Sequence, residues 1–139
     1  MTITRVFERL YLSGVGDADD LAVSNPLGIA AVVNVETQPN RSKRDGIQYV
    51  HFPLDESKRI PPTTFGPVMG ALIRLIRTGK VLVHCEAGSS RAPVVAALYL
   101  HVVGYKNFDE ALAEIKTLRP IVSPSKSIIE SAKAYLEAL

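Results

Sequence analysis

The sequence lacks the features that mark several special classes of protein. It has one cysteine, Cys85, so no disulfide can form within the chain, and a reducing, intracellular setting is expected. The net charge is only +2, and no basic stripe interleaved with aromatic residues is present, which argues against a nucleic-acid partner. No apolar run is long enough to span a bilayer, and charges interrupt the N-terminal residues before a signal-peptide core develops. These absences favour a cytoplasmic monomer with no membrane association.

What the sequence does contain is typical of an ordinary globular domain. Of the 139 residues, 47% are hydrophobic and 22% are charged. There are no repeats, low-complexity tracts or linker-like changes of composition. A chain of this length can bury a core without disulfides or metals. We therefore expect a single domain over residues 1–139.

Short apolar segments alternate with helical patterns along the chain. Strands are expected within residues 4–14, 28–36, 47–53 and 80–84. Helices are expected within residues 17–28, 62–78, 93–103 and 108–118, and a last one with Ser123-Pro124 as its cap and first turn. Strands that alternate with helices, followed by a run of helices, predict an α/β fold. Its mostly parallel central sheet would carry helices on both faces.

Two of the expected helices differ in how their apolar residues are distributed. In the helix that begins at Pro62, apolar residues recur at helical spacing and predict one buried face, formed by Phe65, Val68, Met69, Leu72, Ile73 and Ile76. The segment 93–103 is apolar all round, which is typical of a helix buried in the middle of a domain.

The cysteine stands in a loop between an expected strand and that buried helix. The loop, "HCEAGSSR", has no bulky apolar side chain between Cys85 and Arg91, and Gly88 lies in its middle. Such a loop can curl so that successive backbone N–H groups converge on an anion. Arg91 opens the next helix, so a helix N-terminus and a guanidinium fork act at the same place. The pattern predicts a phosphate-binding loop at the carboxyl end of a strand, where open α/β sheets bind ligands.

The same field favours the thiolate form of Cys85. Thiols beside helix N-termini and cations ionise at lower pH than a free thiol does. His84 is expected to orient the loop or to donate into a network around the sulfur. The alternative is a small buried thiol that merely closes the strand. That alternative does not account for Gly88, Arg91 and the strand-to-helix context together.

These residues carry a resemblance to a known family. His-Cys, five residues with glycine in the middle, and then Arg form a motif that resembles the signature of cysteine-based protein phosphatases. Further segments resemble the dual-specificity branch of that family: "RLYLSGVGDADDL", "AAVVNVE", "YVHFPLDES" and "LRPIVSPSKSIIESAKAYL". They are similar to its opening strand and helix, its central strand, its acid-loop approach and its closing helices. The resemblance covers nearly all of the chain and implies the dual-specificity or tyrosine phosphatase fold.

The resemblance also implies a mechanism. Cys85 would attack phosphorus as a thiolate, and Arg91 would bind two phosphate oxygens. The phosphate, or sulfate or vanadate in its place, would be cradled by the amides of Glu86, Ala87, Gly88, Ser89, Ser90 and Arg91. Phosphotyrosine and phosphoserine or phosphothreonine on proteins or peptides would be hydrolysed through a phosphocysteine. No metal or other cofactor is implied, and the sequence offers no metal-ligand cluster.

The leaving oxygen needs a proton, which members of this family take from the loop before the long helix. That loop here is "PLDESKRIPP". Counting from Pro53 places the acid at Glu56, whereas counting back from the cysteine places it at Asp55. We expect Asp55, the shorter side chain usual at this place, with Glu56 as the alternative.

One position departs from the family pattern. A serine or threonine commonly follows the arginine, and its hydroxyl supports the departing thiolate in the second step. Here that position is Ala92, followed by Pro93. This "RAP" version resembles the phosphatases of regenerating liver. It predicts normal formation of the phosphocysteine and slow breakdown of it.

Other activities are compatible with parts of this pattern. Phosphoinositide phosphatases tend to carry basic residues inside the loop, where this chain has Glu86, so lipid or other non-protein phosphates are the alternative substrates. A phospho-binding module with weak activity is a second alternative, although such modules typically lose the cysteine or the arginine. A rhodanese-like sulfurtransferase would have a shorter span between cysteine and arginine.

Several further polar residues are given structural roles. The basic residues of the two loops would form solvated surface, or alternatively a basic rim for acidic phosphopeptides: Arg41, Lys43, Arg44, Lys58 and Arg59. His51 and His101 are expected to serve packing or surface roles.

Overall fold

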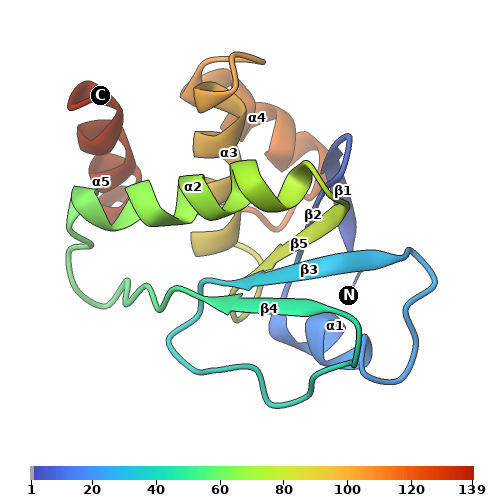
Figure 1. Cartoon of the computed structure of the whole chain (residues 1–139). Helices are drawn as coiled ribbons and strands as arrows, with labels where there is room; N and C mark the ends of the chain where they lie inside the picture. The colour runs from blue at the N-terminus through green and yellow to red at the C-terminus, as the bar shows by residue number, and fades with distance from the viewer. Residues whose placement is uncertain (1) are drawn as a thin grey trace.

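A five-stranded sheet lies at the centre of the protein. The structure is a computed structural model that describes residues 2–139 (Figure 1). The strands are β1 (Thr4–Phe7), β2 (Leu10–Ser13), β3 (Ile29–Asn34), β4 (Gln48–His51) and β5 (Lys80–His84). Their order is β1-β2-β5-β3-β4. β1 runs antiparallel to β2, and the other neighbouring pairs are parallel. The predicted mostly parallel sheet is confirmed.

Helices cover both faces of this sheet, as predicted. They are α1 (Val15–Asp20), α2 (Phe65–Ile76), α3 (Arg91–Val102), α4 (Phe108–Leu118) and α5 (Lys126–Glu137), with a 3₁₀ turn, η1 (Pro62–Thr64), before α2. Figure 1 shows α2 to α5 on one side of the sheet and α1 on the other. The sheet therefore has a large core on one face and a small one on the opposite face.

Alternation along the strands divides the apolar side chains between these two cores. Leu12 and Val83 belong to the buried cluster shared with α2, α3, α4 and α5. Leu82, the residue before Val83 in β5, and Val32, its partner in β3, belong to a second cluster, which includes Ala18 of α1. Successive side chains of a strand point to opposite faces, so each strand contributes to both cores. All these side chains have 3% or less of their surface exposed, so hydrophobic burial fixes the strands' register.

α3 runs through the large core, as the sequence predicts. Each of its first ten residues, from Arg91 to Leu100, is buried. It follows β5 after a loop of six residues, 85–90, so its N-terminus is fixed at the carboxyl edge of the sheet. The position of this loop is therefore set by two of the most buried elements of the fold.

The first helix differs from its predicted extent of 17–28. α1 begins at Val15, whose N–H donates to Glu86 O at 2.8 Å, so the helix starts against the cysteine loop. It ends at Asp20, and turns follow. Near the end of this segment the Asn25 side chain bonds both the N–H and the C=O of Ile29. That side chain replaces the predicted last turns of helix with a closed turn before β3.

Two details of the other helices are also corrected. Ile73 is 37% exposed and does not belong to the buried face of α2, where Leu75 is buried instead. The last helix is capped by Ser125, whose hydroxyl accepts from Ile128 N at 3.3 Å, and not by Ser123-Pro124. Ser123 lies outside the helix because its N–H donates to Ser89 O at 2.8 Å.

Candidate active site

Three polar residues stand side by side where the parallel strands end. The strand register pairs Ser13 of β2 with His84 of β5, and His84 with Asn34 of β3. All three are fully buried. Polar groups are buried only where they bond to something, so this edge is built to hold other parts of the chain. The loop that follows β5, residues 85–90, lies on it.

The backbone carbonyl groups of this loop accept hydrogen bonds from donors outside the loop. Each successive carbonyl from residue 85 to residue 89 accepts a hydrogen bond from a donor elsewhere. The pairs are His84 Nδ1 with Cys85 O (3.1 Å), Val15 N with Glu86 O (2.8 Å), Arg119 Nη2 with Ala87 O (3.3 Å), Arg119 Nε with Gly88 O (2.9 Å) and Ser123 N with Ser89 O (2.8 Å). In a trans peptide the N–H points away from the C=O. The amides of residues 86–90 therefore point away from these donors, an orientation that suits the expected anion cradle.

Two glycines allow the loop to pack this closely. A Cβ on Gly88 would lie 2.7 Å from the backbone C and O atoms of Ser13 and 2.7 Å from Arg119 Nη2. Gly88 also has φ +70°, in the left-handed region that favours glycine. A Cβ on Gly14 would lie 2.8 Å from Glu86 O. The loop therefore requires glycine both within itself and in the segment beneath it.

Arg91 is buried at the mouth of the cradle with a donor to spare. Only 8% of the residue is exposed, and its Nη1 donates to Leu54 O at 2.9 Å. Nε lies 3.7 Å from Glu56 Oε1, too far for a hydrogen bond, and nothing within residues 2–139 accepts from Nε. A buried guanidinium with an unsatisfied donor is costly unless a ligand completes its bonds. The geometry suits a tetrahedral oxyanion.

Cys85 lies at the same place, 2% exposed, at the start of the loop. α3 begins at Arg91, and no side chain of the described residues caps its first N–H groups, so they are available to an anion. The inward amides, the N-terminus of α3 and the guanidinium of Arg91 together give a positive field at the sulfur. Cys85, Arg91 and the loop between them, which the sequence singles out, therefore lie at one edge of the sheet, between β5 and α3.

His84 supports this loop from behind as a neutral ring. Burial lowers the pKa of His84 below its ordinary value of 6.5. Nδ1 then donates to Cys85 O, and Nε2, 2.9 Å from Asn40 Nδ2, accepts from that amide. The predicted orienting role of His84 fits these contacts. Asn40 was not predicted, because nothing in its sequence context points to a partner 44 residues away.

The two candidate acids lie differently. Asp55 Oδ1 accepts hydrogen bonds from Ser57 Oγ (2.6 Å) and Ser57 N (3.0 Å), which lower the pKa of Asp55. Glu56 instead lies on the loop, where its Oε2 accepts from Ser90 Oγ at 2.5 Å and its Oε1 faces Arg91. The structure therefore brings the alternative, Glu56, to the cradle and turns the expected Asp55 towards Ser57.

The other polar residues singled out from the sequence have local partners. Arg41 forms an ion pair with Asp19 at 2.6 Å, and Arg44 donates to Leu21 O at 3.2 Å. His51 lies 2.7 Å from Glu36 O, and His101 Nδ1 accepts from Phe108 N at 3.0 Å. Lys43 Nζ lies over the Tyr49 ring, 5.7 Å from its centroid. These contacts suit structural roles and leave Lys58 and Arg59 as the basic residues of the acid loop.

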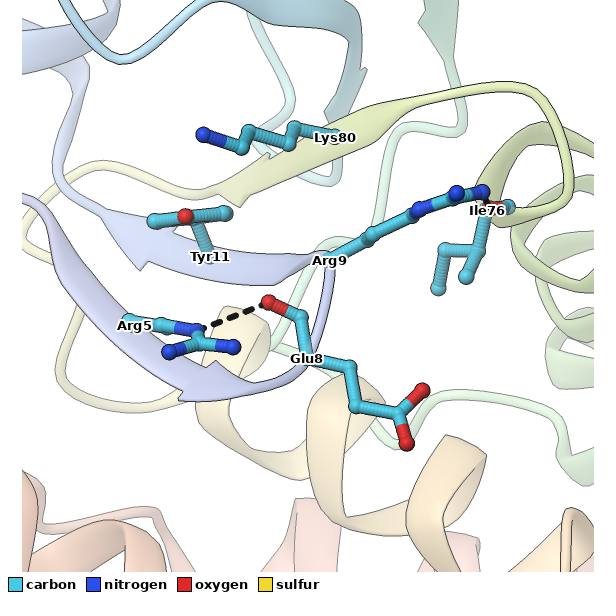
Figure 2. A pocket seen from close by; sticks show the side chains of 6 residues that line it. All are labelled: Arg5, Glu8, Arg9, Tyr11, Ile76 and Lys80. Carbon is cyan, nitrogen blue, oxygen red and sulfur yellow. Dashed lines mark hydrogen bonds between the residues drawn. The ribbon is translucent and has the colours of Figure 1, made fainter.

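Two cavities involve residues near this site. One of about 330 Å³ is lined by Asn40 and Glu86, and another of about 240 Å³ by Leu54 and Asp55, but neither is lined by Cys85 or Arg91. A cavity of about 490 Å³ lies elsewhere, between the β1–β2 turn and the end of α2 (Figure 2). Its cations are engaged by backbone: Arg9 Nη1 binds Ile76 O and Arg77 O, and Arg5 Nε binds Glu8 O. Those contacts explain that cluster as a structural feature.

Residues 2–139 contain no group of three or more His, Cys, Asp or Glu placed to hold a metal ion. No helix of this part of the chain is both long and apolar enough to cross a membrane.

A cysteine and a buried arginine that flank an amide cradle, at the end of a central parallel strand, define the class of cysteine-dependent phosphatases. The family model "Dual specificity phosphatase, catalytic domain" matches residues 10–137. The chain belongs to this family.

Individual relatives agree with this assignment. Dual specificity protein phosphatase 1-B of Xenopus laevis is 30% identical over 122 residues, which cover 86% of this chain and 33% of that protein. This chain thus spans about a third of the length of the first curated relatives it matches. A crystallised variant of human DUSP28 is 25% identical, with a TM-score of 0.88 over 99% of this chain and 96% of that one. A mouse protein assigned as a dual specificity phosphatase and crystallised with zinc tungstate is 26% identical. Its TM-score is 0.85 over 99% and 87% of the two chains.

Proposed function

We propose that this protein hydrolyses phosphomonoesters on proteins and that Cys85 is its nucleophile. The observation that carries the proposal is the loop itself. Five successive carbonyls are bound by donors outside the loop, so the amides of residues 86–90 point away from those donors, and Nε of Arg91 is left without an acceptor among the described residues. Such preorganised donors would stabilise the charge of a phosphoryl group in transfer without reorganisation. The related mouse protein was crystallised as a complex with zinc tungstate, which supports oxyanion binding by this chain.

The reaction has two steps at this site. In the first, the Cys85 thiolate attacks phosphorus, an S–P bond forms and the P–O bond to the substrate breaks. The leaving oxygen takes a proton from an acid. In the second, water attacks the phosphocysteine, the acid's conjugate base takes the water's proton, and the S–P bond breaks to release phosphate and thiolate. Arg91 and the amides hold the same equatorial oxygens throughout.

We propose Glu56 as the acid. Its carboxyl group lies at the mouth of the cradle, where the Ser90 hydroxyl orients it. Asp55 is less suited, because its Oδ1 is bound by Ser57 Oγ and Ser57 N and not by a residue of the cysteine loop. This assignment replaces our expectation from the sequence with its stated alternative.

Phosphotyrosine and phosphoserine or phosphothreonine on proteins or peptides are the proposed substrates, and the cytoplasm is the proposed location of the enzyme. The names of the curated relatives support dual specificity. Glu86 stands in the loop directly after Cys85, and its charge would repel a phosphoinositide headgroup that carries several phosphates. Phosphotyrosine should react faster, because a phenol leaves more easily than an aliphatic alcohol.

The test is the hydrolysis of p-nitrophenyl phosphate, phosphopeptides and phosphoinositides by the wild type and by Cys85→Ser. The proposal expects activity on the first two, little on the lipids, and complete loss of activity in Cys85→Ser. Activity that survives the substitution contradicts the nucleophile. Binding of phosphopeptides without turnover would indicate a phospho-binding module, and a preference for lipids would overturn the substrate class.

A further inference from the structure

Arg119, which follows the last residue of α4, bonds two distant parts of the chain. It is 4% exposed. On one side its Nε and Nη2 donate to Gly88 O (2.9 Å) and Ala87 O (3.3 Å) of the cysteine loop. On the other its Nη1 donates to Thr2 O (2.7 Å) and Thr4 Oγ1 (3.1 Å) at the N-terminal side of the sheet. One guanidinium thus connects the cradle to Thr2, which lies 117 positions before Arg119 in the chain.

The two loop carbonyls bound by Arg119 decide where two cradle amides point. The peptide that carries Ala87 O also carries Gly88 N–H, and the peptide that carries Gly88 O also carries Ser89 N–H. Because C=O and N–H point in opposite directions in a trans peptide, binding both oxygens from behind turns both amides forward. Two of the five carbonyls of residues 85–89 are held by this one side chain, whereas the other three each have their own donor.

Arg119 also places a second positive charge behind the loop. Burial lowers the pKa of Arg119, while the negative charges of Asp17 and Cys85 counteract this effect. A guanidinium remains protonated in proteins, so the charge persists. Its acceptors on both sides are neutral, so none of these bonds cancels the charge.

We infer that Arg119 is a positioning residue of the phosphate site: it fixes the Gly88 and Ser89 amides in their phosphate-binding orientation by binding Ala87 O and Gly88 O from behind. It does not touch the phosphate itself. The inference rests on the proposed function only in treating the cradle as an oxyanion site. It adds that the segment at Thr2 and Thr4 supports the cradle through Arg119.

The competing explanation is that Arg119 only stabilises the fold. Arg9 provides a comparison, because its exposed guanidinium also bridges two carbonyls, Ile76 O and Arg77 O; Figure 2 shows its side chain reaching towards Ile76. Those carbonyls end α2 and do not belong to the site. A purely structural arginine would change the melting temperature and the fraction of active protein, whereas a positioning residue changes the affinity of the remaining folded protein for oxyanions.

The experiment measures vanadate inhibition and kcat/KM for p-nitrophenyl phosphate in four variants: Arg119→Met, Arg119→Lys, Thr4→Val and Arg9→Met. Loss of the Arg119 bonds should raise the vanadate inhibition constant roughly tenfold or more and lower kcat/KM by a similar factor. Arg119→Lys retains the charge but not the fork, so it should show most of the same loss. Thr4→Val removes one outer acceptor and should give a smaller change in the same direction. Arg9→Met should leave both quantities unchanged.

The outcomes separate the inference from the proposed function. A wild type that binds no vanadate overturns the proposed function, and this inference with it. A wild type that binds vanadate, with unchanged inhibition constants in Arg119→Lys and Thr4→Val, overturns the inference alone. An increase in Arg9→Met equal to that in the Arg119 variants also overturns it. If Arg119→Met does not fold, Arg119→Lys and Thr4→Val decide the question.

Discussion

The hydroxyl of Ser90 donates a hydrogen bond of 2.5 Å to Glu56 Oε2, and this contact joins the acid loop to the phosphate cradle. The two residues lie 34 positions apart, one before α2 and one at the start of α3. Ser90 also accepts from Ser125 N at 3.4 Å, at the cap of α5. A carboxyl group held in this way is oriented before substrate arrives, which is what general acid catalysis requires.

Replacing the acid should separate Glu56 from Asp55. Glu56→Gln removes the proton donor, so turnover of phenyl phosphate, whose leaving group is poor, should fall by about 10²–10⁴-fold. Asp55→Asn should retain most of the activity. The pH–rate profiles of kcat are measured for both variants. Only Glu56→Gln should lose the decline of kcat at high pH that marks loss of the acid's proton. The reverse ranking would restore Asp55 as the acid.

Ala92 should make the second step slow. The residue is fully buried at the start of α3, and its methyl group cannot donate a hydrogen bond to the departing sulfur. We expect a burst of p-nitrophenol close to one per enzyme, followed by a slower steady state. Ala92→Ser should raise kcat roughly 10–100-fold, the value of a hydrogen bond to a charged group, and abolish the burst. Linear product release from time zero by the wild type, without a trapped phosphoenzyme, would contradict this prediction.

Gly88 should tolerate no side chain. Gly88→Ala adds a Cβ 2.7 Å from Ser13 backbone atoms at φ +70°, so both strain and overpacking act. We expect a loss of about 2–5 kcal/mol in the free energy of unfolding, together with weaker vanadate binding. Gly104→Ala is the control, because it has φ +81° but nothing within 4 Å of the added Cβ. It should lose only about 1 kcal/mol or slightly more. Equal losses of unfolding free energy in Gly88→Ala and Gly104→Ala, measured by denaturant unfolding, would contradict the prediction, because the close contact at residue 88 would then cost nothing.

The neutral state of His84 should make stability depend on pH. Because burial lowers the pKa of His84 below 6.5, the unfolded chain binds a proton near that pH which the folded protein does not. Stability is therefore fully present above pH 6.5 and falls as the pH drops below it, towards the pKa in the folded state. At pH 7.5 the His84→Gln variant should have a lower melting temperature than the wild type. Between pH 7.5 and pH 5.5 its melting temperature should fall less than that of the wild type. An equal fall in both proteins would contradict a buried neutral imidazole.

The general arrangement could be predicted from local patterns. Short apolar segments between helical patterns predicted the strands and a sheet covered by helices on both faces, and glycine and arginine at fixed offsets from Cys85 predict the cradle. What could not be predicted depends on contacts between distant residues. Arg119 and Asn40 reach the loop only through the fold, and neither stands in a local motif that signals a partner.

The acid and the last helix show the same limit at a finer scale. Whether Asp55 or Glu56 faces the site depends on the turn that Ser57 closes, which a count of residues does not determine. Ser123 has the composition of a helix cap, but its backbone N–H binds the cysteine loop, so Ser125 caps α5 instead.

The most direct test of the account is the rate at which iodoacetate alkylates Cys85 at pH 7, with and without phosphate. Cys85 is the only cysteine of the chain, so the reaction reports on it alone. The account predicts that phosphate occupies the cradle and slows the alkylation in proportion to its occupancy. An alkylation rate that saturating phosphate leaves unchanged would contradict the account.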